Sequence, residues 1–102
     1  MNNLKTGLGV ITWSNGDTYE GEYLNGFKHG QGLYTWSDGK RYEGQYVSNK
    51  SSGSGVMMWP NGEKYTGQFK EGEQHGLGVY SWPSGEEKEC KYARGKFVKW
   101  IE

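Results

Sequence analysis

The chain has 102 residues and a formal net charge of zero, and although only 32% of its residues are apolar, 16% are aromatic. Balanced charge argues against a nucleic-acid binder, which normally carries a basic face. The sequence contains no apolar run of 18 residues that could span a membrane, and the N-terminus lacks the apolar stretch of a signal peptide. The single Cys90 cannot form an internal disulfide. We therefore expect a cytoplasmic protein.

Glycine and aromatic residues recur every 23 residues along most of the chain. Tryptophan occupies one phase of this repeat in every unit: Trp13, Trp36, Trp59 and Trp82. A fixed period of this length is typical of arrays in which each unit stacks on its neighbours. We therefore predict a single domain over residues 1–102, with a half-unit at about 7–18, repeats at about 19–41, 42–64 and 65–87, and a degraded terminal repeat at 88–102.

Two turn signals follow one another in each unit. The first comes after the tryptophan, as in Asn15-Gly16, and the second about ten residues later, as in Asn25-Gly26. Both pairs accept positive φ at low cost and mark hairpins. The runs between them are rich in Thr, Tyr and Val, and their frequent glycines would break a helix. The sequence therefore predicts an all-β, antiparallel β-meander of about eight strands, two per repeat.

The length of the first turn decides which side chains share a face. A three-residue loop pairs Trp13 with Asp17 and Ile11 with Tyr19, which puts the repeating rings and glycines on one face. A two-residue loop would instead pair Trp13 with Thr18. We favour the longer loop, because glycine then lets neighbouring rings lie flat across the strands. A single-layer sheet without helices would have to curl, leaving a partly exposed aromatic groove.

The segment from Tyr19 to Gly32, YEGEYLNGFKHGQG, closely resembles the MORN (membrane occupation and recognition nexus) repeat. It recurs as YEGQYVSNKSSGSG from Tyr42 and YTGQFKEGEQHGLG from Tyr65. In a degraded copy, Lys88 and Cys90 replace the expected Tyr and Gly. The resemblance implies antiparallel hairpins stacked into an elongated, curved, single-layer sheet. It also implies a non-enzymatic role in protein–protein contacts, with a proposed membrane or phosphoinositide role in some relatives.

The leading hypothesis is a scaffold or adaptor that holds a peptide or helix of a partner protein in the aromatic groove. Tyr and Trp offer large contact areas with few rotatable bonds. The candidate contact residues are Ile11, Tyr34, Met57 and Tyr80, at a phase that varies between repeats, together with Tyr19, Tyr42 and Tyr65. The plainer alternative is that these rings only form the core between repeats.

Two other interactions compete with this hypothesis. Basic residues near the C-terminus suggest an anionic membrane surface, where each adds about 1 kcal/mol of binding. These candidate lipid contacts are Lys88, Lys91, Arg94, Lys96 and Lys99. The terminal strands could also pair to form homo-oligomers. Either interaction would fit a cytoplasmic protein, free or at the periphery of a membrane or the cytoskeleton.

We expect no cofactor, metal or catalytic site. His29 and His75 share a phase of the repeat, but a metal would need three or four ligands at matched spacing. Cys90 has no partnered histidine in sequence. The tail from Phe97 to Glu102 lies outside the period, and we expect Trp100 and Ile101 to cap the last aromatic layer rather than dock on another chain.

Overall fold

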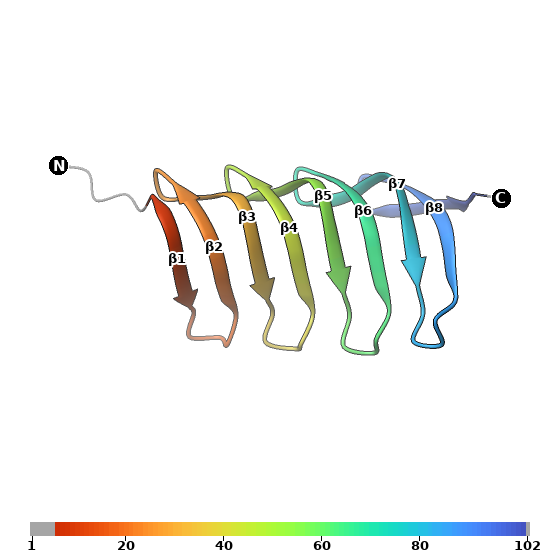
Figure 1. The fold of residues 1–102 in the computed structure, drawn as a ribbon, viewed down its shortest axis with the longest axis horizontal. Helices are drawn as coiled ribbons and strands as arrows, with labels where there is room; N and C mark the ends of the chain where they lie inside the picture. Colours follow the sequence, from red (N-terminus) through yellow and green to blue (C-terminus); the bar gives the residue numbers. More distant parts are fainter. Residues whose placement is uncertain (1–5, 102) are drawn as a thin grey trace.

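The computed structural model describes residues 6–101, which form nine antiparallel strands (Figure 1). The strands are β1 (Gly7–Thr12), β2 (Thr18–Leu24), β3 (Phe27–Thr35), β4 (Arg41–Val47), β5 (Lys50–Met58), β6 (Lys64–Lys70), β7 (Glu73–Ser81), β8 (Glu87–Ala93) and β9 (Lys96–Trp100). They pair in sequence order within one open sheet. The predicted all-β meander is confirmed, and the array measures 54 × 23 × 18 Å.

The ninth strand corrects the prediction of eight. The tail does not leave the array: β9 pairs with β8, with Tyr92 opposite Phe97 and Cys90 opposite Trp100. The Trp100 ring lies 5.5 Å from that of Trp82 and 6.2 Å from that of Tyr80. Trp100 therefore packs on the last aromatic layer, as the capping prediction requires, and does so from an added strand. Ile101, which was predicted to join it, instead lines a depression with Val79 and Glu89.

The predicted register is also confirmed. Ile11 stands opposite Tyr19 and Gly9 opposite Gly21. The Trp13 amide donates to the Asp17 carbonyl at 2.9 Å, which closes a three-residue loop. The same bond recurs 23 residues later in each following unit. Because side chains alternate along a strand, this register places the glycines and the repeating rings on one face.

A line of glycines runs across the sheet beneath these rings. Opposed pairs connect Gly9, Gly21, Gly32, Gly44, Gly55, Gly67 and Gly78, and the line ends at Cys90. The Tyr42 ring lies so close over this line that a Cβ at Gly55 would come within 2.6 Å of its Cε1. The Tyr42 hydroxyl donates to the Gln45 carbonyl at 2.8 Å. Tyr19 and Tyr65 repeat this arrangement.

The longer strands bend where a glycine has positive φ. Gly30, Gly53 and Gly76 have φ of 88°, 78° and 88°, and the pairing register shifts at each of these places. Figure 1 shows the strands curving over near one end. The bend brings Tyr46 edge-on to Tyr42, with ring centroids 5.3 Å apart. It therefore closes over the aromatic face and buries the core there.

Seven residues form this core: Tyr19, Tyr23, Tyr42, Tyr46, Tyr65, Phe69 and Cys90. Backbone bonds between the second turns tie neighbouring repeats together. The Asn49 amide donates to the Lys28 carbonyl at 2.9 Å, and Gly72 makes the same bond to Ser51. Asn49, which replaces a glycine of the repeat, has φ of 75° and also accepts from the Lys28 amide through its side chain at 2.7 Å.

Candidate functional site

Partly exposed side chains form a row along the aromatic face, beside the Asn-Gly turns. We call this row the aromatic ledge: Ile11, Trp13, Tyr34, Trp36, Met57, Trp59, Tyr80, Trp82 and Trp100. Trp13 is 37% exposed and Trp100 39%, and the others are half-buried. Trp13 stacks on Tyr34 with ring centroids 5.5 Å apart, and Trp59 stacks on Tyr80 at 5.7 Å. Met57 separates these two aromatic groups along the ledge.

An acidic residue in the first turn holds each ledge tyrosine. The Tyr34 hydroxyl donates to Asp17 Oδ2 at 2.8 Å, while Oδ1 of the same carboxylate accepts from the Ser37 amide at 2.8 Å. The bond from Tyr34 lowers the pKa of Asp17 despite its burial. Burial, together with Asp17, raises the pKa of Tyr34 to about 12. At neutral pH the phenol therefore remains a donor to a charged acceptor.

The other units show how this pairing varies. Glu63 occupies the phase of Asp17, and its Oε1 accepts from the Tyr80 hydroxyl. In the middle repeat Lys40 takes that phase, and its partner position holds Met57, which has no hydroxyl to donate. The Lys40 ammonium lies 4.4 Å from the Trp36 ring centroid instead. The two positions therefore covary between the repeats: an acidic residue accompanies tyrosine, and lysine accompanies methionine. This covariation was not recognised from the sequence.

Positive charge also borders the ledge. Lys28 Nζ lies 5.8 Å from the Trp13 ring centroid and 5.7 Å from that of Tyr34. Burial lowers its pKa. Lys88 lies 5.7 Å from the Trp100 ring centroid. At such distances a cation is attracted to the face of a ring, so the ledge combines exposed aromatic surface with ammonium groups.

The predicted contact residues divide into two groups. Ile11, Tyr34, Met57 and Tyr80 lie half-exposed on the ledge. Tyr19 and Tyr65 have no exposed surface and Tyr42 has 1%. These three rings are enclosed between glycines of adjacent strands, and burial raises the pKa of each to about 12. They belong to the core and offer a partner no surface, whereas Trp13 and the other tryptophans, which were not among the predicted contacts, do.

The five predicted lipid contacts do not share one face. Lys91 stands opposite Lys99. Lys88 is on the aromatic face, because it pairs with Tyr80 and lies three positions from Lys91 along β8. Arg94 lies in the turn that joins β8 and β9, where its amide donates to His75 Nδ1 at 3.2 Å. Lys96 pairs with Ala93 at the same end of β9.

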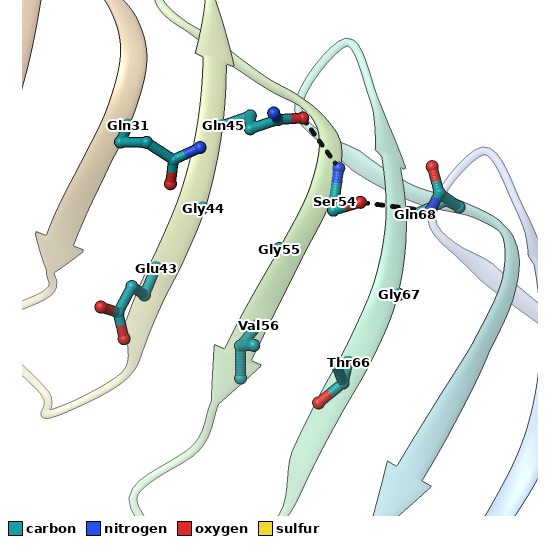
Figure 2. Close-up of a pocket in the computed structure, with 10 residues that line it drawn as sticks. All are labelled: Gln31, Glu43, Gly44, Gln45, Ser54, Gly55, Val56, Thr66, Gly67 and Gln68. Carbon is teal, nitrogen blue, oxygen red and sulfur yellow. Dashed lines mark hydrogen bonds between the residues drawn. The ribbon is translucent and has the colours of Figure 1, made fainter.

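The hollowed surface lies on the face opposite the ledge. Three shallow depressions, of about 290, 560 and 290 Å³, follow one another from β2 to β8 and share lining residues. Together they form what we call the polar groove. Glycine backbone forms its floor, and Figure 2 shows its central part, where the Ser54 amide donates to Gln45 Oε1 at 3.2 Å.

Two rows of side chains wall the polar groove. One wall consists of Glu20, Leu33, Glu43, Val56, Thr66, Val79 and Glu89. The other includes Gln31, Gln45, Ser54 and Gln68. The aromatic groove expected from the sequence is thus replaced by two surfaces: a ledge whose rings pack against one another, and a groove lined by polar and aliphatic side chains.

Other side chains of the described residues do not form a further candidate site. Among residues 6–101, no three His, Cys, Asp or Glu side chains are grouped so that they could hold a metal ion. Burial raises the pKa of the Cys90 thiol, whose Sγ donates to the Gly78 carbonyl at 3.6 Å. No helix occurs in the described part of the chain, so none there is long and apolar enough to cross a membrane.

Comparison with known families gives one match. The family model described as "MORN repeat" matches four consecutive segments, residues 1–18, 19–41, 42–64 and 65–87. These segments contain all four turns that follow a tryptophan, the first three of the second turns, and most of the ledge. No protein of curated function matches the chain.

Proposed function

Because the chain belongs to the MORN repeat family, we propose that it is a non-enzymatic scaffold or adaptor that binds a segment of a partner protein along the aromatic ledge. One observation carries the proposal: large aromatic side chains remain partly exposed, in the same place, in every repeat. Tyr and Trp are favoured anchors at protein interfaces. A contiguous row of partly exposed apolar side chains is typical of a binding site.

The ledge is also held in position before any partner arrives. Hydrogen bonds to Asp17 and Glu63 hold Tyr34 and Tyr80, and neighbouring rings restrict the tryptophans. Such preorganisation lowers the entropy cost of binding. Because Lys28 and Lys40 lie against the same rings, a peptide or helix with apolar and acidic residues would complement the ledge.

Matched lysine substitutions test the ledge. Met57→Lys places a charge in the middle of the ledge, whereas Val47→Lys places one on a β4 side chain that is 50% exposed off the ledge. We expect proteins captured from native lysate by the parent to be lost with Met57→Lys and kept with Val47→Lys. Thermal melting followed by circular dichroism should show both variants folded. Equal capture by all three proteins would refute the ledge as the binding surface.

A peripheral membrane or phosphoinositide role is the second candidate. It is favoured by β9, which combines the exposed apolar side chains of Phe97, Val98 and Trp100 with Lys96 and Lys99. Sedimentation with phosphatidylserine vesicles at low and physiological salt tests it, because attraction to anionic lipid weakens as salt screens it. Binding that disappears in a Lys96→Ser, Lys99→Ser variant would support this candidate, and unchanged binding would exclude it.

The proposal extends to assembly and location. β1 is a free edge strand whose Leu8 and Val10 are 82% and 67% exposed. Such an edge invites pairing with a second copy, so we propose homo-oligomers formed through edge strands. Light scattering of the parent and of Val10→Lys tests this. The unpaired, buried thiol of Cys90 is consistent with the cytoplasm, which is the compartment we propose.

A further inference from the structure

We propose that the polar groove is a second docking surface, separate from the ledge. Its occupant would be an extended segment of a partner protein with a lysine or arginine at every third residue. The segment would run along the array, across the strands. Charge, spacing and groove shape support this independently of the ledge, so the proposal does not rest on the function proposed above.

One wall of the groove alternates acidic and aliphatic side chains. Cross-strand pairs place Leu33 between Glu20 and Glu43, and Val79 between Thr66 and Glu89. The glutamates are exposed, while the aliphatic side chains between them are half-buried. Each carboxylate thus stands beside a small apolar surface. The long stem of a lysine or arginine can lie on such a surface while its charged head reaches the acid.

The carboxylates of the groove glutamates have no partner in the part of the chain that the structure describes. Asp17, Glu22 and Glu63 each accept a hydrogen bond from a neighbouring residue. Within residues 6–101, the side-chain carboxylates of Glu20, Glu43 and Glu89 take part in no hydrogen bond or ion pair.

Basic side chains of the described residues lie near the groove glutamates but do not form ion pairs with them. Arg41 and Lys64 occupy the next row towards the turns. Neither forms an ion pair with the groove glutamates, which therefore remain available to an external cation.

The spacing of the acids selects the conformation of the occupant. Glu20 and Glu43 are two strands apart, which at about 4.8 Å per strand is roughly 9.6 Å. A polyproline II helix advances about 9.3 Å per three-residue turn, and every third side chain points the same way. A β-strand alternates its side chains, so every third one would point away from the groove. A polyproline II segment with regularly spaced cations therefore matches the repeat of the wall.

The groove has the extent that such a segment needs. Its three depressions run without a break from Glu20 on β2 to Glu89 on β8. Six strand spacings correspond to about 29 Å, or about ten residues of polyproline II at roughly 3.1 Å each. Glycine at the floor leaves room for the backbone of the occupant, because all side chains of the groove stand in its walls.

Thr66 occupies the phase that is glutamate in the other units, since Glu20, Glu43 and Glu89 differ from it by multiples of 23 residues. The preferred ligand should therefore carry a positive charge opposite each of Glu20, Glu43 and Glu89, and none opposite Thr66. Thr66→Glu would complete the acidic row. This substitution gives a test in which binding improves, which a damaged fold cannot imitate.

The experiment measures fluorescence anisotropy of two labelled peptides with the folded protein at low salt. One peptide has five Lys-Pro-Pro triplets, and the other has the same composition with its lysines in a single block. We expect the triplet peptide to bind more tightly. A variant with Glu20→Gln, Glu43→Gln and Glu89→Gln should lose roughly tenfold in affinity, and Thr66→Glu should gain about twofold, as expected for exposed ion pairs.

Matched controls separate a site from general charge. A second triple variant, Glu71→Gln, Glu73→Gln and Glu86→Gln, removes the same charge outside the groove and should retain binding. Met57→Lys on the ledge should also retain it, so failure of the ledge proposal leaves this one intact. Absence of binding, equal affinity for the two peptides, an equal loss in both triple variants, or no gain from Thr66→Glu would each overturn the proposal.

Discussion

The internal repeats and the terminal repeat fill the space above their paired strands in different ways. In the internal units a tyrosine covers two opposed glycines, as Tyr42 covers Gly44 and Gly55. In the terminal unit Lys88 replaces the tyrosine, and both glycine positions carry side chains, Cys90 and Trp100. The space that a ring would take is filled from the strands themselves. The comparison shows that ring and glycines form one unit, in which loss of the ring permits loss of the glycines.

The largest expected effect comes from filling an internal glycine position. A Cβ at Gly44 would lie 2.5 Å from the Gly55 Cα and 2.7 Å from the Ser54 carbonyl oxygen. Because backbone atoms cannot step aside as a flexible side chain can, we expect Gly44→Val to lower the free energy of unfolding by about 3 kcal/mol. Urea denaturation, with the slope compared to that of the parent, measures the change.

The same side chain at the terminal unit is the control. Cys90 already carries a side chain in this layer, and Lys88 stands where the covering tyrosine of the internal units would be, so Cys90→Val should cost no more than about 1 kcal/mol. Similar losses from the two valines would contradict the idea that the ring determines which positions must be glycine. A Gly44→Val variant as stable as the parent would contradict the ring-over-glycine arrangement itself.

The sequence predicted the arrangement of Tyr42 and Gly44 because it depends on turn length and strand pairing, which are both set within one repeat. Turn length sets the cross-strand pairs, and pairing then sets which residues share a face. The bend at Gly53 lay beyond such reasoning, since it depends on a positive φ and a register shift that composition does not specify. That bend buries Tyr42 and Tyr46 together. The sequence therefore predicted an exposed groove where the structure has a buried core and the aromatic ledge.

The end of the chain shows another limit. β9 lacks the tryptophan and glycine phases that marked the other strands, so the period did not reveal it. Its pairing depends on the turn at Arg94-Gly95, whose φ values of 52° and 80° repeat those of the earlier second turns. The hydrogen bond between Asp17 and Tyr34 was likewise not predicted, although covariation between the repeats carried the signal.

A double-mutant cycle in the terminal unit tests whether ring and glycine are coupled, with a smaller expected effect on stability. Lys88→Tyr alone should destabilise the protein, because the new ring would meet the Cys90 side chain. With Cys90→Gly also present, the ring gains the space that internal rings have. We expect a favourable coupling of about 1 kcal/mol between the two changes, towards the lower end for residues in contact because Trp100 still occupies the second glycine position. Strict additivity would mean that ring and glycine act independently.

The smallest effect concerns the tyrosine hydroxyl of the internal unit, which the terminal unit lacks. Tyr42→Phe keeps the ring but removes its hydrogen bond to the Gln45 carbonyl, at a cost of about 0.5–1 kcal/mol near neutral pH. Burial raises the pKa of Tyr42 to about 12, above the ordinary value of 10.0. Its contribution to stability is therefore complete below pH 10 and is lost as pH rises towards 12. Urea unfolding across this range should show a shallower decline for Tyr42→Phe than for the parent. A decline of equal slope would mean that Tyr42 ionises as easily in the folded chain as in the unfolded one, and that its ring is not enclosed between the strands.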